Sequence, residues 1–318
     1  MRFMRAIAAA CLHLGAFAQD SPTRPITIAV TYAPGGAADV VTRLILPEHS
    51  KALGQPMVVE NGPGAGGNVG TDHVEKARKD GYTLVMGGAV SHAINVSLYR
   101  NPPYNAVSDL GPVSLVASLT SALVAQSWLP FGTLKGLLAH ARSDAGKLSY
   151  ALGGSGTTAF LAAEWFKSIA QIDMLHVPYR GGGAAMLGQL AGRVDLQFDL
   201  MTTALQNIRT GKLRAIGLPS ARRSGLLPEL PTFAEAGVPG MAYSSWFALY
   251  ATAGTPKDIV EHLNREVVKV LSMPEVKRRL LDNGTEATPS SASRLRAHTL
   301  SEIAKWAAVV RQSDARVK

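Results

Sequence analysis

The sequence predicts an α/β protein of two lobes with a ligand cleft between them. A unit of strand, glycine-rich turn and helix recurs along the chain, which is typical of α/β folds. The chain has 318 residues, of which 47% are hydrophobic, so it can bury a large core and exceeds the usual size of one domain. Two long apolar segments, residues 113–126 and 243–252, bracket the middle third of the chain.

The first unit lies in residues 26–45, with the sequence ITIAVTYAPGGAADVVTRLI. Residues 26–32 alternate in pattern and are rich in β-branched side chains, as in a buried strand. Pro34-Gly35-Gly36 breaks the strand, and apolar residues at helical spacing begin at Ala37. The free backbone N–H groups of the helix then face whatever lies beyond the carboxyl end of the strand. Glycines allow a ligand to approach the main chain closely, so we expect a carboxylate or phosphate there.

The same pattern predicts the remaining elements in chain order. Further strands are expected at residues 57–60, 82–86, 148–152, 174–177, 194–199 and 212–218. Helices are expected at residues 69–79, 159–170, 184–190, 257–272, 274–282 and 291–317, with one more starting near Thr202.

The two bracketing segments are predicted to be single long strands that cross between the lobes. The expected organisation is a signal peptide at 1–18, the first part of lobe 1 at 19–124, lobe 2 at 125–242, and a return to lobe 1 at 243–318. Glycine loops from both lobes then meet at strand carboxyl ends, which places the ligand in the cleft.

Loops at these strand ends supply the candidate ligand-binding residues. Asp199 ends a predicted strand and is either a ligand or water partner or the cap of the following helix; His92 is either a ligand contact or a local hydrogen-bonding group. The candidates are Tyr32, Ala33, Pro34, Gly35, Gly36, Ala37, Ala38, Asp39, Ser91, His92, Gly153, Gly154, Ser155, Gly156, Thr157, Thr158, Tyr179 and Asp199.

The N-terminus predicts export. Arg2 and Arg5 precede a mostly apolar stretch, and Ala16-Phe17-Ala18 is a small-residue cleavage signal, so the mature chain is expected to begin at Gln19. Cleavage removes Cys11, the only cysteine, and with it any disulfide or cysteine metal site. An alternative is a lipoprotein with lipid attached to Cys11.

Composition argues against several other functions. Losing the two arginines lowers the formal charge from +9 to +7, but the basic residues are dispersed and aromatics are 6%, so nucleic acid is not expected as a partner. Gly62, Gly64 and Gly67 match G-x-G-x-x-G, but no acid ends the next strand, so no dinucleotide cofactor is expected. The histidines are scattered, which argues against a metal site and against an enzyme.

Five segments resemble the Bug-type (TctC-like) substrate-binding receptors of tripartite tricarboxylate transporters. They are TIAVTYAPGGAADVVTRLI, LGQPMVVENGPGAGGNVGTDHVEKARKDGYTLVMG, HAINVSLY, LPTFAEAGVPG and SSWFALYATAGTP, within a similarity that runs from about Pro22 to Val310. Gly62, Val96 and the pair Thr202-Thr203 depart from the family pattern beside loops, so they are expected to affect the ligand rather than the fold.

This resemblance implies a type II periplasmic binding protein fold and solute capture without catalysis. It also implies that two opposing loops, residues 32–39 and 153–158, bind a small organic carboxylate: a di- or tricarboxylate, an amino acid or an aromatic acid. The expected protein is a periplasmic monomer that delivers solute to membrane transporter subunits. A sensor feeding a membrane signalling partner would have the same sequence features, and genomic neighbours would separate the two.

Overall fold

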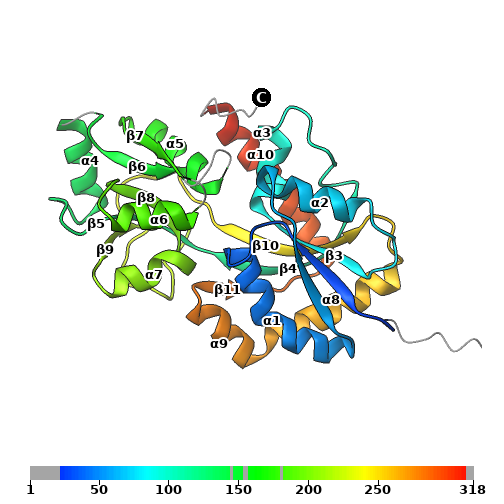
Figure 1. Ribbon diagram of the computed structural model, residues 1–318. Helices are drawn as coiled ribbons and strands as arrows, with labels where there is room; N and C mark the ends of the chain where they lie inside the picture. Colours follow the sequence, from blue (N-terminus) through cyan, green and yellow to red (C-terminus); the bar gives the residue numbers. More distant parts are fainter. Residues whose placement is uncertain (1–21, 144–145, 153–156, 180–181, 313–318) are drawn as a thin grey trace, which may run out of the picture.

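The computed structural model describes residues 22–143, 146–152, 157–179 and 182–312. Each lobe is built on its own mixed sheet, and Figure 1 shows the two lobes side by side, connected by long strands. This confirms the predicted α/β architecture of two lobes.

The sheet of lobe 1 has six strands in the order β11-β4-β10-β3-β1-β2. Parallel pairing joins β1 to β2 and β3, whereas β10 pairs antiparallel with β3 and β4, and β11 pairs antiparallel with β4. The strands are β1 (Ile26–Val30), β2 (Met57–Asn61), β3 (Thr83–Gly88), β4 (Leu110–Leu119), β10 (Ser245–Thr252) and β11 (Thr285–Ala287).

Helices from both ends of the chain cover this sheet. They are α1 (Ala37–Leu53), α2 (Asn68–Glu75), α3 (Asn95–Leu98), α8 (Lys257–Ser272), α9 (Pro274–Asp282) and α10 (Ala292–Gln312), with a 3-10 turn at Ala65–Gly67 and a π-helical turn at Val90–Ile94. The bounds of α8 and α9 are those that the sequence predicts. The short edge strand β11 was not expected from the sequence.

The sheet of lobe 2 has five strands in the order β7-β6-β8-β5-β9. They are β5 (Ser121–Gln126), β6 (Ser149–Leu152), β7 (Leu175–Pro178), β8 (Leu196–Leu200) and β9 (Leu213–Gly217). The helices of this lobe are α4 (Leu134–Ser143), α5 (Thr158–Ala170), α6 (Gly182–Leu190) and α7 (Met201–Arg209).

Residues 113–126 form two strands rather than the one long strand that hydropathy suggests. β4 pairs within the lobe 1 sheet up to Leu119, and β5 pairs within the lobe 2 sheet from Ser121, so the chain changes sheets at Thr120. Both strands are nearly fully buried, so an apolar pattern alone does not reveal the break.

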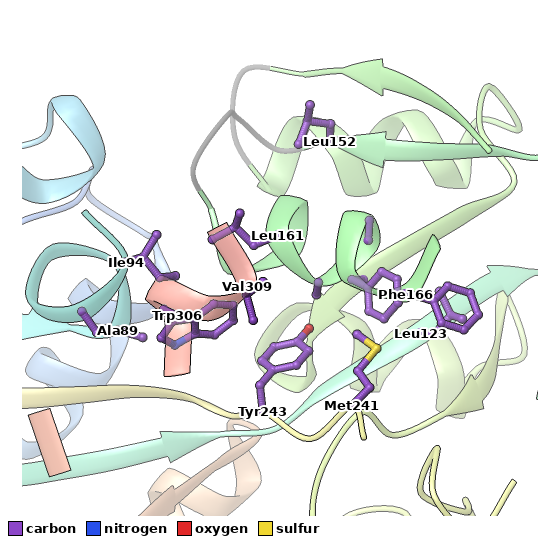
Figure 2. Packing of buried hydrophobic residues seen from close by; sticks show 14 of the residues in the cluster. Ala89, Ile94, Leu123, Leu152, Leu161, Phe166, Met241, Tyr243, Trp306 and Val309 are labelled. Carbon is purple, nitrogen blue, oxygen red and sulfur yellow. The ribbon is translucent and has the colours of Figure 1, made fainter. Parts of the chain in front are cut away.

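One hydrophobic cluster continues from lobe 1 into lobe 2. Figure 2 shows Trp306 and Val309 of α10 between Ala89 and Ile94 of lobe 1 and Leu161 of α5 in lobe 2. Trp306 is fully buried, and its ring lies edge-on to Trp165 of α5 at a centroid distance of 6.5 Å. The C-terminal helix therefore packs against both lobes beside the crossing strands.

Among the described residues, no helix combines the length and apolar character needed to cross a membrane.

Candidate functional site

A cavity of about 320 Å³ lies between the lobes and is lined by both of them. This volume is at the lower end of the range usual for small-molecule sites. The described lining residues are Tyr32, Gly35, Gly36, Ala37, Ala38, Val90, Ser245 and Phe247 from lobe 1, and Ser121, Ala151, Thr157, Thr158, Ala159, Gly182, Gly183, Gln197, Phe198, Asp199, Leu200, Thr202 and Thr203 from lobe 2.

The lobe 1 wall contains the N-terminus of α1, which has no side-chain cap. Gly36 occupies the cap position with extended backbone angles, and the first N–H to bond within the helix is that of Val40, to the Gly36 carbonyl. The N–H groups of Ala37 and Ala38 precede that bond, and both residues line the cavity. Two backbone donors and the positive end of a 17-residue helix therefore lie at the cavity wall, an arrangement typical of anion-binding sites.

Asp39 stabilises the glycine turn in front of this helix end. Its carboxylate accepts hydrogen bonds from Gly35 N at 2.9 Å, from Arg43 Nε at 3.0 Å and from Asn61 Nδ2 at 3.0 Å. Burial by itself raises the pKa of Asp39, but these hydrogen bonds and the Arg43 charge outweigh it and lower the pKa. Asp39 therefore remains ionised and shapes the turn, while its side chain is only 4% exposed and the residue does not line the cavity.

The lobe 2 wall carries the starts of two more helices. Thr157 caps α5 by accepting a hydrogen bond from Phe160 N at 3.2 Å, and Thr158 and Ala159 of its first turn line the cavity. Gly182 and Gly183, at the start of α6, also line it. The remaining residues of the second candidate loop, Gly153, Gly154, Ser155 and Gly156, lie outside the described residues.

Asp199 and Gln197 lie on β8 and bring the carboxyl and amide groups of lobe 2 to the cavity. The Asp199 carboxylate accepts a hydrogen bond from Thr203 Oγ1 at 2.7 Å. Burial raises the pKa of Asp199 from 3.8 to about 6, although Thr203, Leu200 and Gln197 bond to it. Asp199 does not cap α7: the cap position belongs to Leu200, and no side chain caps that helix.

The rest of the lining is largely apolar and carries no basic side chain in the part of the chain that the structure describes. Tyr32 and Phe247 pack at a centroid distance of 6.3 Å on the lobe 1 side. The sequence pattern did not indicate that the cavity is also lined by Gln197, Ser121, Ser245, Phe247 and the pair Thr202-Thr203. Ser121 and Ser245 are the first residues of β5 and β10, Gln197 and Phe247 lie within β8 and β10, and Thr202-Thr203 lie in the first turn of α7. No single local signal therefore identifies them.

Six predicted site residues do not line the cavity, and one of them, Asp39, is described above. Ser91 and His92 are fully buried in the π-helical turn, where Ser91 Oγ bonds to His92 Nδ1 at 2.9 Å and His92 stacks on Tyr250 at 4.0 Å. Burial lowers the pKa of His92 to about 3, so it is neutral at physiological pH. Of the two roles considered for His92, the local hydrogen bond is the one observed.

The other three predicted residues shape neighbouring turns. The Ala33 carbonyl accepts a hydrogen bond from Gly36 N at 3.1 Å, and Pro34 is exposed in the same turn. Tyr179 is half-buried and packs over Gly188 of α6. These three residues stabilise the turns, and neighbouring residues line the cavity.

Two α/β lobes that are joined by crossing strands and enclose a shared cavity define a type II periplasmic binding protein. The model of the tripartite tricarboxylate transporter family receptor (TctC) matches residues 41–314. The chain belongs to this family.

Named relatives include Bug-type proteins. The chain is 35% identical over 302 residues to the protein BugT of Bordetella pertussis, which covers 95% of this chain and 93% of that protein. The fold of this chain is similar to that of R. palustris Rpa4515 with adipate. The TM-score is 0.87 and the identity 33%, and the match covers 94% of this chain and 100% of that one. The fold is also similar to that of MatC from Rhodopseudomonas palustris with bound malate, with a TM-score of 0.82, 32% identity and coverage of 91% and 99%.

Proposed function

We propose that this protein is a periplasmic receptor that captures a small organic carboxylate and presents it to the membrane subunits of a tripartite tricarboxylate-type transporter. The observation that carries the proposal is the uncapped N-terminus of α1, whose first residues Ala37 and Ala38 line a cavity between two lobes. Two structurally similar proteins were solved with the dicarboxylates adipate and malate, which supports a carboxylate of four to six carbons here.

Binding by backbone donors explains how an anion is held by a cavity wall without lysine or arginine among its described residues. The helix N-terminus supplies fixed partial positive charge, and the apolar walls exclude water, which strengthens the interaction. The proposed cycle is capture in the open cleft, closure of the lobes about the crossing strands at Thr120 and Ser245, and release at the membrane partner.

Thermal-shift and calorimetric titration of the mature protein test this function. The panel contains mono-, di- and tricarboxylates, amino acids and aromatic acids, and the matched control for each dicarboxylate is its neutral diamide. A true ligand at a hundred times its Kd stabilises the fold by about 2.7 kcal/mol, whereas its diamide has little effect. Equal binding of acid and diamide, or no binding by any carboxylate, would refute the proposal.

The transport role has a separate test. In the proposed system the ligand-loaded receptor binds detergent-solubilised transporter subunits, and deletion of the receptor gene abolishes uptake of the bound solute. Uptake that continues unchanged in the deletion strain would leave a binding protein with another partner.

A further inference from the structure

The lobe 2 side of the cavity is built to accept hydrogen bonds. Gln197 and Asp199 are two residues apart on β8, so their side chains leave the same face of the strand. Both line the cavity, and they are 3% and 7% exposed.

One acceptor in this pair has no hydrogen-bond partner among the residues that the structure describes. Thr203 Oγ1 donates to Asp199 Oδ2 at 2.7 Å, and the Gln197 amide also bonds to the Asp199 carboxyl. The amide group uses its N–H for that bond, which leaves the Gln197 carbonyl oxygen Oε1 buried with no hydrogen-bond partner among the described residues. Such oxygens are uncommon in folded proteins and are destabilising until a donor reaches them.

No fixed positive charge among the described lining residues neutralises Asp199. The described cavity lining contains no lysine, arginine or histidine. Of the tyrosines, Tyr32 lines the same cavity, and Tyr243 interacts electrostatically with Asp199. Burial raises the pKa of both phenols, so they stay neutral. At neutral pH the Asp199 carboxyl is mostly ionised, because its own pKa is raised only to about 6.

We propose that the solute carries a hydrogen-bond donor, a hydroxyl or an ammonium group, which binds to Asp199 and Gln197 Oε1 while a carboxylate of the same molecule binds to the N-terminus of α1. The inference rests on the proposed function and narrows its substrate class to hydroxy- or amino-substituted carboxylates. An unsubstituted dicarboxylate offers this wall only acceptors, so it leaves Gln197 unpaired and brings like charge toward Asp199.

Calorimetry with matched solutes tests the inference. Each set contains an unsubstituted, a 2-hydroxy and a 2-amino dicarboxylate of one chain length: succinate, malate and aspartate; glutarate, 2-hydroxyglutarate and glutamate; adipate, 2-hydroxyadipate and 2-aminoadipate. In at least one set the hydroxy or amino member binds about tenfold or more tightly than the unsubstituted one, as expected for a hydrogen bond to a charged group. The hydroxy and amino arms distinguish the two donors.

The variant Asp199→Asn reduces that preference to about threefold or less, because the asparagine side chain presents its own donors to the solute. Asp195→Asn is the control: Asp195 directly precedes β8, bonds to Ser149 N at 2.8 Å and does not line the cavity. Thermal melting shows that both variants are folded, and the control keeps the wild-type preference.

Different failures have different meanings. Equal affinities within every set, or a preference that survives in Asp199→Asn, overturn this inference and leave carboxylate capture intact. Absence of binding in all three sets and in the wider panel overturns the proposed function and this inference with it.

Discussion

Replacing Asp199 by asparagine should stabilise the empty protein at neutral pH. Burial raises the pKa of Asp199 from 3.8 to about 6, so the folded state holds this proton more tightly than the unfolded state. The contribution of protonated Asp199 to the free energy of unfolding is fully present below about pH 4 and is lost as the pH rises through 6. Two pKa units correspond to about 3 kcal/mol of lost stability above pH 7.

The asparagine variant cannot ionise and so avoids this loss, while its amide oxygen still accepts a hydrogen bond from Thr203 Oγ1. Urea denaturation at pH 4 and pH 7.5, in buffers free of carboxylates, measures the effect. We expect the variant to exceed the wild type by about 3 kcal/mol at pH 7.5 and by well under 1 kcal/mol at pH 4. Groups common to both proteins, such as His298, cancel in the comparison.

Asp173→Asn is the matched control, because the Asp173 side chain is 73% exposed. Its free energy of unfolding should stay within about 0.5 kcal/mol of the wild type at both pH values. A variant at Asp199 that is less stable than the wild type at pH 7.5, or a difference that does not change with pH, would refute the reasoning that a buried, uncompensated carboxylate lies in the cavity.

Three further predictions concern the glycine turn, the electrostatics and the mature N-terminus. Gly35→Val and Gly192→Val should strain the backbone alike, since the two glycines have φ of 77° and 74°. Only Gly35→Val should weaken carboxylate binding in calorimetry, because Gly35 lines the cavity and Gly192 does not. Equal affinities of the two variants for the carboxylate would contradict the backbone site. Affinity should change little between low and moderate salt, because the described lining has no basic side chain; a tenfold loss would indicate an ion pair. Intact-mass analysis should find Gln19 as the first residue, and lipid retained on Cys11 would show membrane anchoring instead.

Local patterns predicted most of the secondary structure. The start of α1 at Ala37 follows from the Pro34-Gly35-Gly36 break, and α9 begins at Pro274, where proline favours the first helical turn. The predicted first helix after β2 was too long, since α2 ends at Glu75. The break at Thr120 could not be predicted, because β4 and β5 are buried in different sheets and have the same hydropathy.

The candidate site was only partly predictable, for a physical reason. The α1 loop carries its own signal in its glycines, whereas Gln197 and Phe247 look like ordinary strand residues until the sheet order brings them to the cavity. The role of His92 was ambiguous in the sequence because a helix start after a strand can face either the cleft or the core. Here the π-helical turn places it against Tyr250, which position in the sequence does not reveal.

The two ends of the cavity share one feature that explains why binding should favour closure. Polar groups at both ends lack partners among the described residues: the Ala37 and Ala38 N–H groups in lobe 1 and the Gln197 carbonyl in lobe 2. In the open protein water can serve them, but a solute with a carboxylate at one end and a donor at the other satisfies both lobes at once only when they are close together. In the proposed mechanism the differential affinity for the closed form comes from pairing across the cleft, so a ligand that engages one lobe alone should bind without closing it.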